Sequence, residues 1–526
     1  MEKSFNLLDE PWLPVRLADG SIKNVSLLEA FRRSGEIVAL AETAPPNLVA
    51  QYRLLLAILH RALTRRHPQG WKDKDRARWW REGLPIEAIV AYLEYWRERF
   101  WLFHPEYPFM QVAALGEAEE TRGKLKPWTQ ISLASASGNT PVLFDHAWDD
   151  APSAITPAAA ISALLGLMQF TPGGLVKVFR DSDKAGALAN TAAVLPVGEN
   201  LAQTLLLCLH PWQEHDDLPS WERAVLTTLE LCANPVMASG SNDRYTRQSR
   251  AVLLRSESDG LVRWLHFSAG FALEKGNAPD PMNCLLGKVD ENSGEIKWRT
   301  LGFSDNRSFW RDLSALAPNP AGTSQPAAVL SYAAALHDEI NPFNSVFQPV
   351  LVAGIANSPK KAAKLERWRT ERIVLPLMLL KDADKALYLR KLVQKAETLF
   401  GEAKALAVRM LAEIMPAPGD NKDPYKNANA QLDVSSFSAS YFAQAERYLP
   451  EVLQQLGLGE FAQATQSWNQ ALRDSAMAAW RQLVHSMGGG VLAWRADAKY
   501  AGAFHAVLNK HAPKPETDSA HKEETA

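Results

Sequence analysis

Cysteine is scarce in this chain, with three copies in 526 residues. Cys208, Cys232 and Cys284 are far apart and form no CxxC pair. A structural zinc site needs closely spaced thiolates, and a disulfide framework needs many cysteines. The sequence therefore predicts neither a metal site nor a disulfide scaffold, and we expect the cysteines to be inert thiols in the core.

The motifs of several large enzyme classes are also missing. The sequence has no GxxxxGK[ST] phosphate loop, no GxSxG nucleophile elbow and no HExxH zinc pair. Each motif places a reactive group on a turn or helix in a fixed geometry, so its absence argues against that chemistry. We expect a protein that is not an enzyme and needs no cofactor.

Charge of one sign is not in excess, since the formal net charge is −2. This excludes a uniformly basic nucleic-acid binder, so any contact with phosphates must come from local patches. No run of about 18 apolar residues is present, and we expect no membrane span. The N-terminus, which begins Met1-Glu2-Lys3-Ser4, lacks the apolar stretch of a signal peptide, and we expect a cytoplasmic location.

The chain does have length, and its character changes near residue 360. A chain of 526 residues exceeds one ordinary core, so two or three domains are expected. Before residue 360 the pattern is mixed. Helical spacing occurs over 46–66, 85–103 and 158–169, and strand-like runs occur at 251–254 and 261–267. Residues 114–150 lack periodicity and are predicted to form a long loop.

After residue 360 the pattern is helical. Helices are predicted over 361–413, with an interruption near Pro376, and over 434–456, 460–485 and 498–510. Long helices with short connections favour an antiparallel bundle. The predicted fold class is α+β, with an N-terminal mixed α/β domain (1–360), a C-terminal four-helix bundle (361–512) and a polar, disordered tail (513–526).

Two residue pairs suggest a metal site or a docking surface. His337 and Asp338 form an HD dipeptide, which contributes metal ligands in HD phosphohydrolases but needs further His and Asp residues. Trp79 and Trp80 lie in a basic stretch. They could contact a partner, or their indoles could turn inward from a surface helix.

Two segments could contact phosphate. Lys177 follows the glycine pair at 173–174, where a bare backbone can approach a ligand closely, although a plain turn is the simpler interpretation of the pair. Residues 360–409 carry 13 Lys/Arg against 6 Asp/Glu. A spacing of three to four residues predicts a stripe along one side of a helix, which either tracks phosphates or is simply solvated. The stripe consists of Lys360, Lys361, Lys364 and Arg367.

Several short phrases carry a resemblance to a known family. The most specific are FNLLDEPWLPV at residues 5–15 and HPEYPFMQV at residues 104–112. Weaker matches follow in order: SGNT at 137–140, PGG at 172–174, PSW at 219–221, TRQSR at 246–250 and SYF at 440–442. In this order and in a chain of this size, they resemble the CasA family, the large subunit of the type I-E CRISPR surveillance complex, Cascade.

The resemblance implies roles for two loops. Asn139 and Thr140 would lie in a loop that anchors the subunit on the complex bearing the CRISPR RNA (crRNA), near the protospacer-adjacent motif (PAM). A glycine turn would read the PAM from the minor groove, which is narrow and admits a backbone without side chains. The residues of this turn and its lysine would be Pro172, Gly173, Gly174 and Lys177.

The resemblance also implies a wedge and a lysine finger. The family's wedge is a hairpin tip just before a Leu-Glu-Arg sequence, and it splits the first base pairs. Leu-Glu-Arg occurs here at 365–367, so the wedge would be Asn357, Ser358, Pro359, Lys360 and Lys361. The lysine finger has no clear counterpart, and Arg247 and Lys275 are the candidates.

The implied function is that of a non-catalytic DNA-recognition subunit. It would recognise the PAM in double-stranded DNA, promote duplex opening and R-loop formation, and recruit a helicase-nuclease. Its partners would be the other Cascade subunits, crRNA, target DNA and that helicase-nuclease. Two alternatives stay open: an HD-type metal phosphohydrolase using His337 and Asp338, and a helical scaffold that binds only protein through Trp79 and Trp80.

Overall fold

The computed structural model describes residues 2–514 apart from 134, 136–148, 175, 275, 277–278, 291, 305–306, 341–346, 358–364 and 416–422. The chain divides into two compact units. Unit 1 comprises Met1–Arg307 and Ala321–Ile373, and unit 2 comprises Ser308–Pro320 and Val374–Ala526. None of the described helices combines the length and hydrophobicity needed to cross a lipid bilayer.

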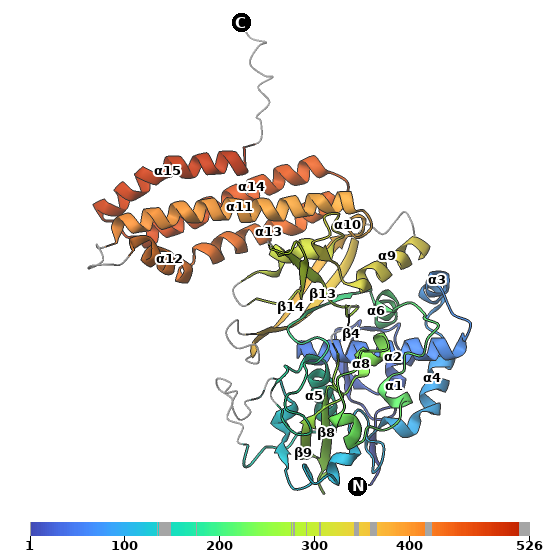
Figure 1. The fold of residues 1–526 in the computed structure, drawn as a ribbon. Coiled ribbons are helices and arrows are strands. Elements are labelled where there is room, and N and C mark those ends of the chain that lie inside the picture. Colours follow the sequence, from blue (N-terminus) through green and yellow to red (C-terminus); the bar gives the residue numbers. More distant parts are fainter. Residues whose placement is uncertain are drawn as a thin grey trace. The chain divides into compact units, whose positions relative to one another are not determined.

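Unit 1 combines helices with small antiparallel sheets (Figure 1). Its helices are α1 (Leu27–Arg32), α2 (Pro45–Arg66), α3 (Asp73–Glu82), α4 (Ile86–Tyr95), α5 (Pro157–Phe170), α6 (Leu201–Cys208), α7 (Thr228–Cys232), α8 (Ser241–Thr246) and α9 (Ala328–Ile340). Short 3-10 helices are η1 (Arg97–Phe100), η2 (Ala113–Gly116), η3 (Trp128–Ile131) and η4 (Ser220–Glu222).

The strands of unit 1 form sheets with the orders β1-β5, β3-β2-β4, β6-β9-β8, β11-β10-β12 and β14-β13-β7. Their bounds are β1 (Ser4–Asn6), β2 (Leu13–Leu17), β3 (Ile22–Val25), β4 (Ile37–Leu40), β5 (Trp101–Phe103), β6 (Lys126–Pro127), β7 (Ala192–Pro196), β8 (Arg250–Ser256), β9 (Val262–Ala269), β10 (Leu285–Val289), β11 (Ile296–Thr300), β12 (Ser324–Gln325), β13 (Phe347–Asn357) and β14 (Leu365–Pro376). The predicted strands at 251–254 and 261–267 are thus confirmed as the β8–β9 pair.

The core of unit 1 is built around α2, which packs against α4, α5 and α8. Almost all of α2 up to Leu63 is buried, as expected for a helix that faces protein on every side. In α5, the Thr156 hydroxyl accepts the Ala159 N–H at 3.2 Å and caps the first turn. Gly166 of α5 lies so close to α2 that a Cβ would be 2.1 Å from the Asn47 side chain. The helices predicted over 46–66 and 158–169 are confirmed.

Two histidines of this core stack face to face. The His60 and His210 rings are 3.9 Å apart with an interplanar angle of 16°. His60 also lies 3.0 Å from the Asn242 side-chain amide. Burial lowers the pKa of His60 well below its usual range and lowers that of His210 to about 3. Both rings are therefore neutral in the folded protein at neutral pH.

This stack predicts that unit 1 loses stability in acid. Because the folded state holds both histidines unprotonated while the unfolded chain protonates them near pH 6.5, stability is complete above pH 6.5 and falls as the pH drops toward 3. The expected slope is up to roughly 1.4 kcal/mol per pH unit for each histidine. Urea unfolding of unit 1 between pH 7.5 and 5 measures it. Replacing the exposed His215 with Gln should leave the slope unchanged, whereas His210→Leu should reduce it.

The start of the first phrase pairs with the strand that directly precedes the second phrase, at residues 101–103. β1 pairs antiparallel with β5, with Ser4 opposite Phe103 and Asn6 opposite Trp101. The helix predicted over 85–103 is therefore wrong at its C-terminal end, and α4 ends at Tyr95. Residues 101–103 make backbone hydrogen bonds with β1 in place of a continued helix.

The helix predicted over 361–413 is wrong at its start, because Leu365–Pro376 is strand β14. Trp368, Thr370, Arg372 and Val374 are exposed, and the residues between them are half-buried, which is the two-residue period of a strand. Charged residues on both faces concealed this period in the sequence. The predicted domain boundary at 360/361 shifts to 373/374, since β14 extends the β13–β7 sheet of unit 1.

Apart from the end of β14, unit 2 is helical in its described secondary structure (Figure 1). It contains η5 (Phe309–Leu316), α10 (Leu377–Lys381), α11 (Ala383–Ile414), α12 (Pro424–Val434), α13 (Phe437–Gly457), α14 (Phe461–Ser486) and α15 (Val491–His511). α13 packs on α14, and α11 packs on α14 and α15. The Trp468 indole N–H donates to the Leu392 carbonyl at 2.8 Å. The helices predicted over 434–456 and 460–485 are confirmed, and the helix predicted over 498–510 is α15, which begins earlier, at Val491. The predicted tail, 513–526, lies outside the described residues from 515 onward.

Candidate nucleic-acid interface

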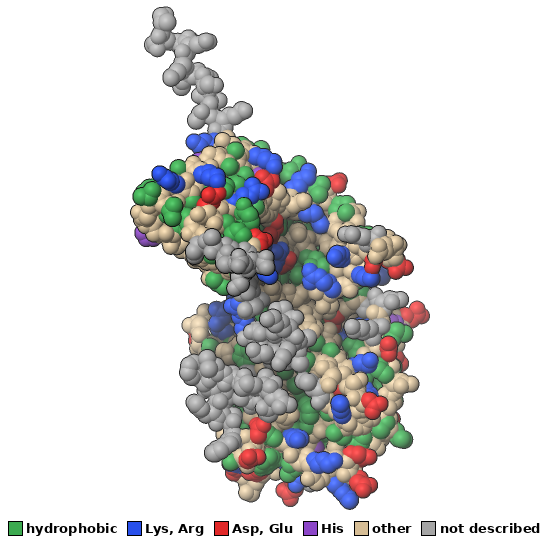
Figure 2. All heavy atoms as spheres, turned by 60° about the vertical axis from the view of Figure 1, so that its left-hand side comes forward, with side chains coloured by type: hydrophobic (Ala, Val, Ile, Leu, Met, Phe, Trp, Pro, Cys, Tyr) green, Lys and Arg blue, Asp and Glu red, His purple; other side chains and the backbone are tan. Residues whose placement is uncertain are grey.

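Positive charge is local on this molecule. Figure 2 shows Lys and Arg side chains interspersed with Asp and Glu over the visible face, in keeping with the net charge of −2. A nucleic-acid contact therefore has to be built from particular turns and strands. The glycine turn after α5 is the predicted site whose backbone the structure describes most fully.

The glycine turn begins directly where α5 ends. Thr171 closes the helix, and Gly173 and Gly174 that follow it are exposed. Gly174 has φ +86°, a left-handed conformation that favours glycine, and a Cβ there would meet no atom within 4 Å. A Cβ on Gly173 would lie 3.0 Å from the Ala185 nitrogen. The backbone at Gly174 therefore faces open space, whereas Gly173 is glycine for reasons of packing.

A returning segment holds the turn in place. The Gly174 N–H donates to the Asp183 carbonyl at 2.8 Å, and the Gly186 N–H donates to the Thr171 carbonyl at 2.9 Å. A Cβ on Gly186 would lie 2.6 Å from the Gln169 carbonyl oxygen, so the two segments are in close contact. The turn is thus supported on its inner side by backbone hydrogen bonds.

A buried ion pair anchors the same turn. Arg250 Nη1 lies 2.7 Å from Asp183 Oδ2, and the two side chains are 1% and 0% exposed. Arg250 also donates to the carbonyl of Lys184 at 2.9 Å and to the carbonyl of Pro172. Burial raises the pKa of Asp183 and lowers that of Arg250, because each charge has left water. The sequence analysis did not predict this pair: Arg250 appeared there only as the end of the phrase at 246–250, and a buried charge carries no periodic signal.

The residues after the turn carry both exposed and anchored side chains. Lys177 is exposed. Phe179 has φ +69° and packs on a core cluster that includes Val112, Leu231 and Leu253. Arg180 donates to the Glu230 carbonyl at 3.3 Å. The only predicted binding side chain that projects from this segment into solvent, among its described residues, is Lys177.

Arg247 is a correction to the sequence analysis. Its guanidinium is buried, pairs with the Asp243 carboxylate at 3.0 Å through Nε and donates to the Val236 carbonyl at 2.8 Å. It also lies over the Phe271 ring at 4.6 Å. This burial contradicts the predicted contact of Arg247 with DNA, and the residue instead holds the strand-to-loop junction together. The other candidate, Lys275, lies outside the described residues, as do Asn139 and Thr140.

The predicted wedge connects two neighbouring strands. β13 ends at Asn357 and β14 begins at Leu365, and they are adjacent in one sheet. Ser358, Pro359, Lys360, Lys361 and Lys364 lie outside the described residues. Arg367 is exposed, but it belongs to β14, so the predicted helical stripe of basic residues is wrong at this position. Beside it, Trp368 (37% exposed) and Arg372 face solvent on the strand, and the sequence analysis missed them.

Three residues of the two alternative hypotheses pack against other side chains, whereas Asp338 is exposed. His337 is buried, and its Nε2 lies 2.7 Å from the Gln348 side-chain oxygen. In the described part of the chain, no three His, Cys, Asp or Glu side chains are grouped to hold a metal ion. Trp79 is buried against Trp71, and Trp80 lies edge-on to His337. The indoles therefore turn inward, as the simpler interpretation of that helix expects.

Comparison with known proteins places the chain among CRISPR-associated proteins. Residues 6–479 match the family model of the CRISPR-associated protein Cse1. The chain is 33% identical over 516 residues to the CRISPR-associated protein CasA/Cse1 of Thermus thermophilus, covering 97% of this chain and 98% of that protein. The chain belongs to the Cse1 (CasA) family, which confirms the resemblance carried by its short phrases.

Solved structures have the same fold. The crystal structure of CasA from Thermus thermophilus matches with a TM-score of 0.81 at 31% identity, covering 97% of this chain and 100% of that one. A chain of a CRISPR RNA-guided surveillance complex matches with a TM-score of 0.72 at 20% identity, covering 96% and 100%. The α+β fold class is confirmed by these similarities.

Proposed function

We propose that this chain is the non-catalytic large subunit of a crRNA-guided surveillance complex of the Cascade type. It recognises the PAM in double-stranded DNA, promotes duplex opening and R-loop formation, and recruits a helicase-nuclease. Family membership and the fold it shares with a chain of a surveillance complex support the assignment. The observation that carries it is the exposed, side-chain-free turn at Gly173 and Gly174, anchored from behind by Arg250 and Asp183.

The turn suits minor-groove recognition by shape. The minor groove is about 6 Å wide, and base pairs there present a degenerate pattern of donors and acceptors. The Gly174 N–H is already bonded to the Asp183 carbonyl, so this amide is not available to a base. The PAM would then be selected by how well the bare backbone of the turn fits the shape of the minor groove. Lys177 would be available to contact a phosphate. A relaxed PAM preference is the expected consequence.

Duplex opening is assigned to the connection between β13 and β14. The free energies of the DNA duplex and of the RNA–DNA duplex that replaces it are nearly equal. Unstacking the first base-pair step costs roughly a few kcal/mol, so this cost decides whether the exchange begins. Two paired strands are a suitable support for a wedge, because their backbone hydrogen bonds keep the connecting segment in place while it separates the base pairs. The segment from Asn357 to Lys361 would act there, with Lys364, Arg367 and the described Arg372 near the strand phosphates.

A binding experiment tests the proposal as a whole. Guide complex reconstituted with and without this chain is titrated onto duplex targets with every PAM, and onto single-stranded and pre-opened targets. We expect the chain to tighten binding of the PAM-bearing duplex by at least about tenfold and to leave the single strand unchanged, since only the closed duplex needs opening. Equal binding of all targets with and without the chain would refute the proposal and favour a purely structural scaffold.

The basic segment before β14 gives a second prediction. Replacing Lys360, Lys361 and Lys364 with Gln should weaken duplex binding and reduce the slope of log Kd against log salt by roughly 0.9 for each lost phosphate contact. A matched control replaces three exposed lysines elsewhere in unit 1, namely Lys23, Lys124 and Lys288, and should change the slope little. The same change in both triple variants would mean that only net charge matters.

A further inference from the structure

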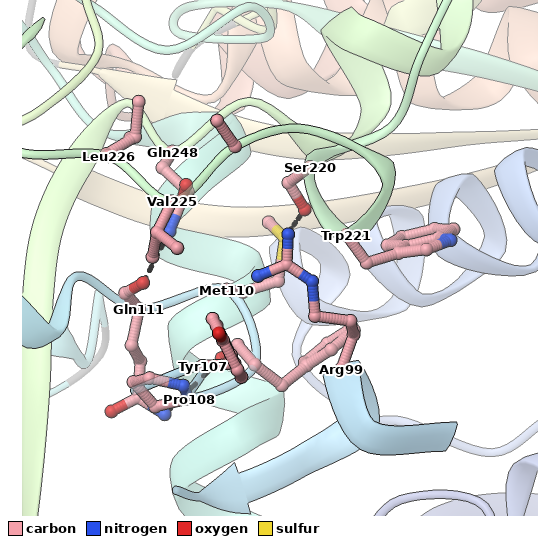
Figure 3. Close-up of a pocket in the computed structure, with 12 residues that line it drawn as sticks. Arg99, Tyr107, Pro108, Met110, Gln111, Ser220, Trp221, Val225, Leu226 and Gln248 are labelled. Carbon is pink, nitrogen blue, oxygen red and sulfur yellow. Dashed lines mark hydrogen bonds between the residues drawn. The ribbon is translucent and has the colours of Figure 1, made fainter. Parts of the chain in front are cut away.

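Two sequence phrases that the proposed function does not use line one pocket. Residues 104–112 and 219–221 are more than a hundred positions apart, yet Figure 3 shows Met110 of the first beside Ser220 of the second, and Tyr107 and Trp221 line the same pocket. Residues from η1, from the segment after η4 and from the segment just before β8 complete the pocket. Those used below are Arg99, Ala224, Val225 and Leu226.

The pocket wall is rigid. Phe100 and Phe109 stack with ring centroids 5.1 Å apart, and Trp221 packs on Phe100 at 5.3 Å. The His104 Nδ1 accepts the backbone N–H of Tyr107 at 2.8 Å, which fixes the start of the loop. Met110 has φ +55°, a strained conformation for this residue that persists only where the surroundings enforce it. The loop is therefore held in one shape independently of any ligand.

Arg99 brings a positive charge into this pocket without a counter-charge. Its Nη2 donates to the Arg223 carbonyl, and its guanidinium lies 4.9 Å from the Tyr107 ring. None of the ion pairs formed by the described residues includes Arg99, although it is half-buried. Burial lowers the pKa of Arg99. Leaving a cation partly desolvated and unpaired is unfavourable, so the site is poised for an anion from outside.

The surroundings decide which anion fits. Phosphate-tracking surfaces need several cations in a row, and Arg99 is the only Lys or Arg among the described residues that line the pocket. Apolar side chains lie at one side of the rim, where Val225 and Leu226 are half-buried, and the chain continues to Leu229, which is 78% exposed. An arginine set in an apolar rim matches a carboxylate that is flanked by apolar side chains.

We propose that this pocket binds a carboxylate side chain on an apolar segment of a protein partner. The guanidinium provides charge-assisted hydrogen bonds to the carboxylate through the nitrogens that the Arg223 carbonyl does not use. The rim at Val225 and Leu226 covers the flanking apolar side chains, as at the centre of a protein interface. The site does not depend on the DNA-binding role proposed above.

The test uses the purified full-length chain and a fluorescein-labelled peptide with one aspartate between leucines, both ends capped, titrated to about 5 mM to reach millimolar affinities. We expect saturable binding that weakens at least about tenfold for the asparagine analogue and for Arg99→Gln. Arg97→Gln is the matched control, because Arg97 lies on the same 3-10 helix but pairs with Asp9 and Glu94, and it should bind like wild type.

Ala224→Glu provides a variant that keeps Arg99 and its bond to Arg223. Ala224 is exposed at the rim, so the added carboxylate should occupy the site from within and lower peptide affinity as Arg99→Gln does. Equal binding of the aspartate and asparagine peptides, or no binding across the titration, would overturn the proposal. We expect that an added DNA duplex does not displace the labelled peptide. A duplex that binds the wild-type chain but not Arg99→Gln would show that the pocket binds phosphate, which would also overturn the proposal.

Discussion

Gly174→Asp is expected to lower the affinity of the assembled complex for a PAM-bearing duplex by about 100-fold or more. Gly174 is exposed with φ +86°, and the space beside it is empty, so the new side chain adds bulk and negative charge where the turn would enter the groove. Like charges brought together at an interface cost several kcal/mol. Titration of the duplex by mobility shift at fixed salt measures the loss.

Gly174→Asn is the matched control for charge. Asparagine and aspartate have nearly the same shape and are the non-glycine residues that best tolerate a left-handed backbone. The asparagine variant should lose much less affinity, and both variants should bind a single-stranded target like wild type. Equal affinity of the aspartate variant and the wild type for the PAM-bearing duplex would remove the turn from the DNA interface. Equal losses for both variants would show that backbone fit, rather than charge, is what matters.

Gly173 is a weaker test of the same idea, and the reason is structural. A Cβ there would lie 3.0 Å from the Ala185 nitrogen and 3.1 Å from the Asp183 carbonyl oxygen, both backbone atoms. Any substitution at Gly173 therefore displaces the returning segment whether or not DNA is bound. A loss of binding by Gly173→Asp would not separate a damaged turn from a blocked groove.

The sequence predicted helices and strands well where the apolar residues followed a single period, either helical or strand-like. α2 and α5 are apolar on most sides and have Pro at the first turn, so their positions were predicted within one residue. β14 was misassigned because charged residues sit on both of its faces and the helix signal of the following segment overlaps it. Tertiary pairing with β13, which sequence spacing does not report, decides its conformation.

The candidate site was predicted only in part, for a related reason. The exposed glycines at 173–174 were found because glycine in a turn is a local signal. Arg247 was chosen for its charge, but it is buried against Asp243, and charge alone does not distinguish a surface cation from a core ion pair. The Arg250–Asp183 pair that supports the turn was missed, because a long-range pairing is invisible without the fold. The roles of Asn139, Thr140, Lys275 and the wedge residues stay predictions.

Arg250→Met is expected to destabilise unit 1 by about 3–5 kcal/mol, because it leaves the Asp183 carboxylate buried without its partner. The transition that unfolds unit 1 in urea measures this loss. Arg263→Met is the matched control: Arg263 pairs with Glu257 and Asp259 at the surface, so its removal should change the transition little. A small effect of Arg250→Met would mean that the turn does not depend on the ion pair.

The pH dependence of Arg250→Met identifies the cause of its instability. Burial already raises the pKa of Asp183, and loss of the nearby guanidinium should raise it further. A carboxyl whose folded pKa lies above its unfolded value favours the folded state at low pH, and this contribution is lost as the pH rises through the folded pKa. The variant should therefore recover part of its stability between pH 7 and 5, relative to wild type. Asp183→Asn combined with Arg250→Met should recover stability at pH 7 as well, whereas target-duplex binding should stay weak if Arg250, through its bond to the Pro172 carbonyl, positions the glycine turn.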